Sequence, residues 1–254
     1  MARFGAWSTL PSSLAVEALG RSGADFVGLD AQHGAHDFGD LARAIQVLDL
    51  LGVESLVRLS ELDLALIPRV LDFGASGVIV AMVERPETAR LAVDFARYQP
   101  GGTRSYGGRR YGLSPEPDDL REVQPAVWTM VETAEALEHL DELAAVPGLA
   151  GFFVGPVDLA LALGVTGTVA RRLSAELASA ATPARTEPAG AWLEAYARVV
   201  RVAHKHGLEA ATFSIGGADA RHWSAAGFDR VVVASDIALL RGALERELRT
   251  AAGA

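Results

Sequence analysis

The sequence of 254 residues has no cysteine and only one lysine, Lys205. The lack of cysteine excludes a disulfide framework, a thiolate nucleophile and a zinc site built on cysteine. It also fits a reducing compartment, and the N-terminal segment lacks the apolar stretch of a signal peptide, so we predict a cytoplasmic protein. No apolar run reaches the length of about 18 residues that a membrane span needs.

Basic residues are scarce as well. The chain has 23 lysines and arginines against 32 acidic residues, for a net charge of -9, and its arginines form no cluster beyond Arg109-Arg110 and Arg171-Arg172. Because nucleic acids attract dense positive charge, we expect no nucleic-acid partner. Half of the residues are hydrophobic, which is enough for a sizeable core. The length suits a single α/β barrel, which typically has about 250 residues.

Short β-rich runs alternate with amphipathic stretches along the chain. Most of the runs are continuously apolar, as expected for strands buried on both faces of a parallel sheet. The predicted strands are residues 4–9, 26–30, 55–59, 77–83, 126–132, 151–156, 209–214 and 230–235. The predicted helices are residues 13–23, 38–52, 64–74, 86–98, 133–145, 192–207, 218–227 and 236–252. Several of these helices end in glycine, which is a common helix stop.

This alternation of eight strands and eight helices predicts an α/β fold, a (β/α)8 TIM barrel that forms a single domain over residues 1–254. An open doubly wound sheet would also alternate, but no G-x-G-x-x-G motif follows the first strand, so a dinucleotide-binding fold has no support. A long loop at 99–125 and an insertion at 165–190 interrupt the pattern. We place both after strands and therefore expect them on the catalytic face of the barrel.

Two acidic residues, Glu132 and Asp158, end separate strand-like runs. The carboxyl ends of parallel strands meet on one face of a barrel, so these carboxylates can converge on a hard divalent cation. Magnesium and manganese take oxygen ligands, often only one or two carboxylates completed by water and substrate. The alternative is helix capping, because each residue precedes a helix-like segment and acids favour helix N-termini. Spacing alone leaves both interpretations open.

Three further residues suggest acid–base and anion chemistry. Asp30 ends the run FVGLD, and His33 lies three residues later, where a histidine held by a carboxylate can act as general acid or base. The alternative is a loop histidine bound to backbone. Arg58 lies inside the apolar run SLVRL, and a buried guanidinium needs an anionic partner. That partner is either a substrate carboxylate, such as that of pyruvate, or a protein carboxylate in a structural ion pair.

Taken together, the motifs resemble those of the HpcH/HpaI aldolase family, the class II pyruvate aldolases that include 4-hydroxy-2-oxoheptanedioate aldolase. The resemblance covers most of the chain, and the most specific motif is G-P-x-D-L-[SA] at Gly155–Ala160. The other segments that carry it are Asp30–His33, Val57–Leu59, Leu71–Ala75, Ala81–Val83, Tyr98–Ser105 and Val131–Thr133.

The resemblance implies a divalent metal cation (Mg²⁺, Mn²⁺ or Co²⁺) held by Glu132 and Asp158. Pyruvate or its enolate would chelate this metal through its keto and carboxylate oxygens. Arg58 would bind the substrate and stabilise the charge on its carbonyl oxygen or enolate. His33, oriented by Asp30, would act through water as the acid or base. No Schiff base is implied, because the single lysine of the chain lies in a helix-like stretch.

Other positions are assigned by the same resemblance. Asp72 matches a catalytic carboxylate that reaches a histidine across a subunit interface. The backbone of Gly155, Pro156 and Val157 would help to bind the pyruvate carboxylate. Met130 would line the substrate site, where the family often has glutamine. The resemblance also implies a homo-oligomer, a hexamer built as a trimer of dimers with the C-terminal helix exchanged between subunits.

The leading prediction is a metal-dependent carbon–carbon lyase that cleaves a 4-hydroxy-2-oxo acid reversibly into pyruvate and an aldehyde. The chain departs from the family at Gln32, usually glutamate, and at Ala31 and Ala81, often glycine and proline. These changes keep two alternatives open. One is an enzyme like macrophomate synthase, which decarboxylates oxaloacetate and adds the enolate to another electrophile. The other is a non-catalytic barrel that serves as a binding protein.

Overall fold

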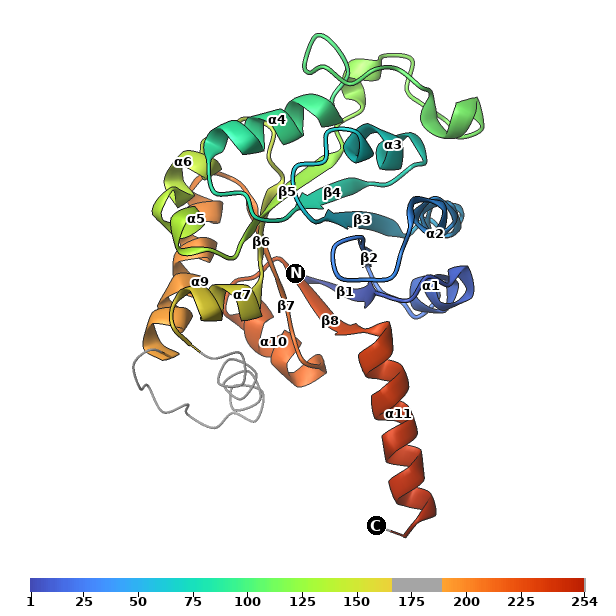
Figure 1. Ribbon diagram of the computed structural model, residues 1–254, viewed down its shortest axis with the longest axis vertical. Coiled ribbons are helices and arrows are strands. Elements are labelled where there is room, and N and C mark those ends of the chain that lie inside the picture. Colours follow the sequence, from blue (N-terminus) through green and yellow to red (C-terminus); the bar gives the residue numbers. More distant parts are fainter. Residues whose placement is uncertain (166–188, 254) are drawn as a thin grey trace.

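In the computed structural model, which describes residues 1–165 and 189–253, eight parallel strands close into a barrel (Figure 1). Each strand pairs with the next along the chain, and the last pairs with the first. This confirms the predicted (β/α)8 barrel. The strands are β1 (Arg3–Ser8), β2 (Phe26–Asp30), β3 (Glu54–Leu59), β4 (Gly77–Val80), β5 (Ala126–Val131), β6 (Gly151–Val154), β7 (Glu209–Phe213) and β8 (Arg230–Ser235).

Helices surround the barrel and connect its strands (Figure 1). The helix predicted at 133–145 is divided at His139, and the helix-like segment noted at Asp158 forms the short helix α7, which begins at Pro156, before Asp158. The helices are α1 (Ser13–Gly20), α2 (Phe38–Leu51), α3 (Leu66–Asp72), α4 (Pro86–Ala96), α5 (Ala134–Glu138), α6 (Leu140–Ala144), α7 (Pro156–Ala162), α9 (Ala189–Lys205), α10 (Gly217–Ala225) and α11 (Asp236–Ala251), with 3-10 turns η1 (Arg109–Gly112) and η2 (Leu120–Glu122).

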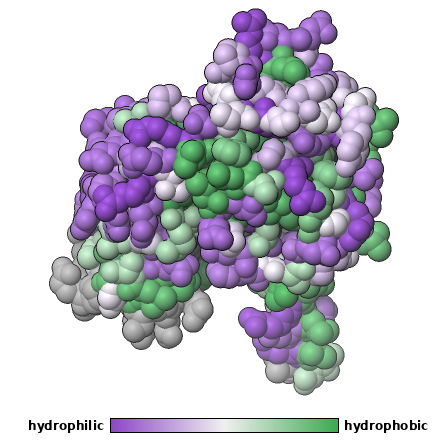
Figure 2. Space-filling view, turned by 45° about the horizontal axis from the view of Figure 1, so that its top comes forward, coloured by the Kyte–Doolittle hydropathy of each residue, from purple (hydrophilic) through white to green (hydrophobic). Residues whose placement is uncertain are grey.

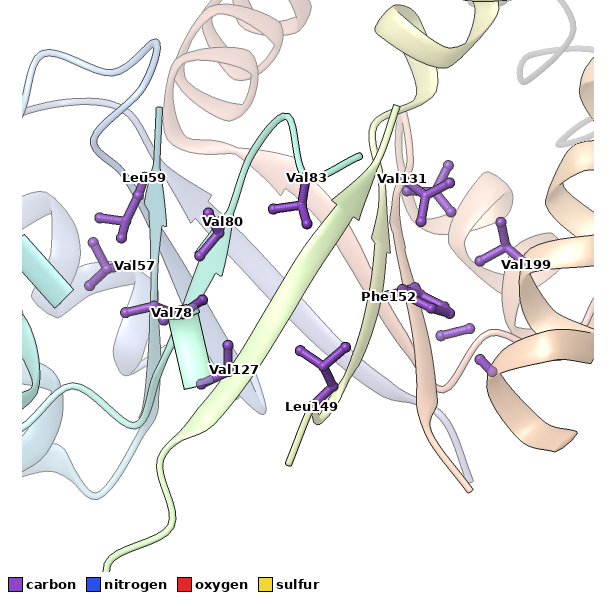
Figure 3. Packing of buried hydrophobic residues seen from close by; sticks show 14 of the residues in the cluster. Val57, Leu59, Val78, Val80, Val83, Val127, Val131, Leu149, Phe152 and Val199 are labelled. Atoms are coloured by element: carbon purple, nitrogen blue, oxygen red, sulfur yellow. The ribbon is translucent and has the colours of Figure 1, made fainter. Parts of the chain in front are cut away.

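The core has two layers, because alternate side chains of each strand face opposite sides of the barrel wall. The outer layer lies between strands and helices and is rich in valine and leucine, as Figure 3 shows for the side around β3 to β6. The inner layer fills the barrel and contains large aromatic residues, among them Trp7, Trp128 and Phe153. Gly28 is required beside this layer, since a Cβ there would lie 2.0 Å from the Trp7 ring.

The long loop at 99–125 does not lie where we predicted. It follows α4 and leads into β5, so it connects a helix to a strand and lies at the amino ends of the strands (Figure 1). Arg109 fixes it there by donating to Asp49 Oδ1 at 2.7 Å and to the Gly74 carbonyl. The loop therefore belongs to the face opposite the carboxyl ends of the strands. The insertion predicted at 165–190 falls mainly outside the described residues.

Helix α11 points away from the body of the barrel (Figure 1). Its first turn is capped by Ser235, whose Oγ accepts from the Ala238 N–H. Figure 2 shows a hydrophobic strip along the projecting helix. Exposed leucines and isoleucine form this strip, at Ile237, Leu240, Leu244 and Leu248. None of the helices in the described ranges is long and apolar enough to cross a membrane.

Candidate active site at the carboxyl ends of the strands

The predicted site residues Asp30, Arg58, Glu132 and Asp158 all lie at the carboxyl ends of the strands. Asp30 is the last residue of β2, Arg58 is next to last in β3, and Glu132 directly follows β5. Asp158 lies in the first turn of α7, just after β6. β2 pairs with β3 up to Asp30 and Arg58, β5 pairs with β6 up to Val131 and Val154, and Glu132 Oε2 lies against Gly155, so the fold sets these groups at neighbouring strand ends.

Asp30 and Arg58 form a buried, two-pronged ion pair. Arg58 Nε donates to Asp30 Oδ1 at 3.0 Å, and Nη2 donates to Oδ2 at 2.5 Å. The indole N–H of Trp7 also donates to Oδ2, at 3.2 Å. Burial by itself raises the pKa of Asp30, but the hydrogen bonds and charge of Arg58 outweigh it and hold the pKa below its usual value. The anionic partner of Arg58 within this chain is thus a protein carboxylate.

His33 is exposed beside this pair, and its contact with Asp30 is through the backbone. The N–H groups of Gln32 and His33 each donate to Asp30 Oδ1 at 3.0 Å. Asp30 therefore shapes the loop that carries His33, whereas we had expected it to orient the imidazole itself. The loop is further tied to β1, since Ala35 N–H donates to the Thr9 carbonyl. Buried His36 completes this attachment, with Nε2 lying 3.2 Å from Ser8 Oγ.

Helix capping does not explain the two carboxylates. Helix α5 is capped by Thr133, whose Oγ1 accepts from the Ala136 N–H at 3.1 Å, and Glu132 takes no part. Helix α7 has Gly155 at its N-cap position and no side-chain cap. Asp158 is exposed two residues inside this helix. The structure thus excludes side-chain N-capping for both carboxylates, while Asp158 keeps a place in the first turn of α7, where acidic residues are favoured.

Glu132 is buried, and its two oxygens have different surroundings. Oε1 accepts from the Met82 N–H at 2.8 Å. Oε2 faces Gly155, where a Cβ would lie only 2.7 Å away, so a larger residue there would displace the carboxylate. Burial raises the pKa of Glu132, the Met82 N–H lowers it, and the nearby Asp158 raises it again. A cation between the two carboxylates would offset both burial and mutual repulsion.

These donors fit a hard divalent ion. No group of three or more His, Cys, Asp and Glu side chains with metal-ligand geometry occurs among the described residues. Two carboxylates completed by water and substrate oxygens are nevertheless what magnesium commonly uses. Met130 is buried below, with its Cε 3.1 Å from the position that a Gly155 Cβ would take, and it lines the floor beside Glu132. Pro156 and Val157, both half-buried, open α7 next to it.

Asp72 lies apart from these groups within the chain. It is the last residue of α3, at the amino-end side of the barrel, and accepts from Arg104 Nη2 at 2.6 Å. Its proposed role across a subunit interface stays a prediction.

Two contacts were missed from the sequence: the Trp7 indole on Asp30 and the Met82 amide on Glu132. Sequence patterns do not show a backbone amide or an indole as a partner of a distant carboxylate.

The chain is similar in sequence and in fold to several known proteins. A sequence model of the family described as HpcH/HpaI aldolase/citrate lyase matches residues 3–243, from β1 into α11. The hydroxypyruvate/pyruvate aldolase of Rhizorhabdus wittichii is 36% identical over 247 residues, covering 96% of this chain and 92% of that protein. An HpcH/HpaI aldolase/citrate lyase family protein from Burkholderia cenocepacia J2315 has a TM-score of 0.83 at 28% identity, over 98% of this chain and 94% of that one. Macrophomate synthase shares the fold, with a TM-score of 0.81 at 22% identity over 99% and 85% of the two chains.

Proposed function

Because the chain belongs to the HpcH/HpaI aldolase/citrate lyase family, we propose that it is a divalent-metal-dependent aldolase. It would cleave a 4-hydroxy-2-oxo acid reversibly into pyruvate and an aldehyde. The observation that carries this proposal is the pair Glu132 and Asp158, which converge at the carboxyl ends of the strands and cap no helix. The relative from Rhizorhabdus wittichii, named a hydroxypyruvate/pyruvate aldolase, supports the substrate class.

Glu132 and Asp158 would hold the cation, Mg²⁺, Mn²⁺ or Co²⁺, which supplies Lewis acidity toward the 2-oxo acid when bound. Arg58 uses Nε and Nη2 for Asp30. Its remaining nitrogen, Nη1, has no hydrogen bond among the described residues and would donate to the carbonyl oxygen of the substrate. Because Asp30 fixes the guanidinium, the donor needs little reorganisation as negative charge develops on that oxygen.

The exposed His33 would move the protons. In the cleavage direction it takes the proton of the C4 hydroxyl through a water molecule, the C3–C4 bond breaks, and the aldehyde leaves. The bonding electron pair remains on the three-carbon fragment as the enolate of pyruvate. Return of the proton to C3 completes pyruvate. His33 is suited to this role because an imidazole can both accept and donate a proton and this side chain reaches solvent.

Deuterium exchange at the methyl group of pyruvate tests the proposal most directly. NMR would follow exchange in D₂O with Mg²⁺, Mn²⁺ or Co²⁺, and again after EDTA. We expect exchange that depends on the cation. If folded protein gives none with any cation, the aldolase proposal fails. A parallel experiment with oxaloacetate then separates the two alternatives. Decarboxylation of oxaloacetate would favour chemistry like that of macrophomate synthase. Unchanged oxaloacetate would favour a non-catalytic barrel.

We also propose that the chain forms a homo-oligomer, a hexamer assembled as a trimer of dimers, in which α11 packs on a second copy. The exposed apolar strip of α11 supports this, because a helix that points away from its own barrel leaves that strip in water. Light scattering after size-exclusion chromatography would test it. The double variant Leu240→Glu with Leu244→Glu should give smaller particles, and an unchanged mass would contradict the role of α11.

A further inference from the structure

Met82 has a backbone conformation that a residue with a side chain rarely adopts. It lies two residues beyond the end of β4, is exposed, and has φ of 55°. The other non-glycine residues with positive φ in the described ranges are Arg110 and Tyr111, both in η1 at the opposite face. Such a conformation persists only where the surrounding structure imposes it, and it is often found at functional sites.

The conformation redirects the chain at the rim of the barrel. Ala81 belongs to the inner layer, whereas Val83 is buried in the outer layer. Figure 3 shows Val83 among the residues of this outer layer, which also contains Val80 and Val131. Between them, Met82 turns its side chain to solvent and its N–H toward the next strand. There the N–H donates to Glu132 Oε1 at 2.8 Å.

This hydrogen bond distinguishes the two oxygens of Glu132. Oε1 is engaged by the amide, while Oε2 has no hydrogen bond among the described residues and faces the gap left by Gly155. A carboxylate held at one oxygen can rotate little, so the free oxygen has a defined direction. Partners that fix a metal ligand in this way usually matter nearly as much as the ligand.

We propose that Met82 is a positioning residue, whose left-handed backbone holds Glu132 Oε1 and thereby presents Oε2 to the cation. This inference rests on the proposed function, in which Glu132 is a metal ligand. The essential feature is the backbone geometry, and the thioether contributes nothing to it. Two rival roles for Met82 compete with this one: its conformation serves only to bury Val83, or its exposed side chain contacts the substrate.

A series of substitutions at one position separates these three roles. Met82→Gly permits positive φ without strain, Met82→Ala keeps the Cβ but removes the thioether, and Met82→Val adds a branch that opposes positive φ. Val83→Ala is the packing control. The readout is Mn²⁺ affinity measured by electron paramagnetic resonance, without substrate, on protein shown to be folded by circular dichroism. The melting temperature and the kcat and KM for pyruvate exchange are measured on the same samples.

We expect Met82→Val to weaken Mn²⁺ binding by about 10–100-fold, as for other residues that orient a metal ligand. Met82→Gly should keep the wild-type affinity and melt at a higher temperature, and Met82→Ala should bind like wild type. Val83→Ala should melt lower with unchanged affinity. The same Met82→Val change should lower kcat at saturating Mn²⁺ if Oε2 is misdirected.

Several results would overturn the inference. Unchanged Mn²⁺ affinity in folded Met82→Val would show that the amide does not orient Glu132. Equal losses in Met82→Gly and Met82→Ala would assign the role to the side chain. If Met82→Val fails to fold, Met82→Gly still decides, since weaker binding there contradicts the backbone argument. Wild-type protein that binds no Mn²⁺ would contradict the proposed metal site itself, and this inference with it.

Discussion

The two ends of the barrel contain similar residues in different arrangements. At the amino ends of the strands, Arg230 donates to Glu54 at 2.6 Å and to Glu209 at 2.7 Å, and Arg3 also bonds to Glu54. At the carboxyl ends, a single arginine, Arg58, pairs with a single carboxylate, Asp30, through Nε and Nη2. Glu132 and Asp158 have no arginine partner there among the described residues.

This difference indicates that the amino end of the barrel serves stability and the carboxyl end serves function. Each acid of the amino-end network faces a guanidinium, as expected where a barrel face serves folding. The carboxyl end leaves two acids that repel each other, and one of them is buried with its pKa raised. Such an arrangement lowers the stability of the empty protein and is retained where a ligand compensates for it. We therefore expect substitutions at the carboxyl ends to reduce activity more than stability. Substitutions at the amino ends should reduce stability more than activity.

The largest expected effect is the loss of cation-dependent turnover in Glu132→Ala or Asp158→Ala. Each removes one of two carboxylates in a site with no third acidic ligand among the described residues, so binding of the cation should fail. Pyruvate methyl exchange measured by NMR, together with circular dichroism, checks this. Glu87→Ala is the matched control, because it removes an exposed carboxylate from the first turn of α4 on the same side of the barrel. Variants with wild-type exchange that EDTA abolishes would show that the cation binds elsewhere.

Arg58→Ala should affect both activity and stability. Loss of a preorganised donor to an oxyanion reduces rates by about 10²–10³-fold. The substitution also leaves Asp30 buried without its cation, and breaking a buried pair costs about 3–5 kcal/mol. Urea unfolding and exchange kinetics on the same preparation measure both. A full loss of stability with a rate change of only a few-fold would make Arg58 a structural residue.

Arg230→Ala should reduce stability and leave activity unchanged. Glu209 loses its guanidinium partner and Glu54 keeps only Arg3, so the free energy of unfolding should fall by about 1–3 kcal/mol. Pyruvate exchange at saturating cation should remain at the wild-type rate, since the network lies at the amino ends of the strands. A large loss of exchange rate in folded Arg230→Ala would mean that the two ends are coupled through the barrel interior.

The eight strands were predictable because parallel strands are buried on both sides, so each appears as a short apolar run. The convergence of Glu132 and Asp158 was predictable for a related reason: in a barrel, whatever follows a strand lies on one face. The same rule shows why our placement of the loop at 99–125 was wrong. A helix was predicted at 86–98, directly before the loop, so the loop follows a helix and lies on the other face.

Other features of the site depend on contacts that the sequence does not encode locally. The partner of Arg58 is Asp30, 28 residues away, and a pattern search cannot distinguish this carboxylate from one on a substrate. The positive φ of Met82 lies between Ala81, which packs in the inner layer, and Val83, which packs in the outer layer. Methionine has no backbone preference from which a positive φ could be predicted. These features follow from tertiary packing, and packing requires the fold.

The smallest expected effect concerns the stability of Glu132→Gln as a function of pH. Burial raises the pKa of Glu132 above its ordinary value of 4.5, so the unfolded chain ionises first as the pH rises. Ionisation there favours unfolding, and wild-type stability falls between pH 4.5 and the higher pKa of the folded state. Glutamine keeps an oxygen for the Met82 N–H but does not ionise. In EDTA, the variant should therefore gain stability relative to wild type across this interval, as urea unfolding at several pH values would show.

Because both proteins contain Asp30, its contribution cancels in the difference between their free energies of unfolding. That contribution runs the other way, since its lowered pKa adds stability above the ordinary value of 3.8, and this is lost as the pH falls through the folded-state pKa. Adding Mn²⁺ at pH 7 then sharpens the comparison. A cation that binds only the folded wild-type site stabilises it in proportion to the logarithm of its concentration, so the order of the two proteins should reverse. If Glu132→Gln is no more stable than wild type in EDTA, the buried carboxylate does not lower the stability of the empty site, and the contrast between the two ends of the barrel loses its energetic basis.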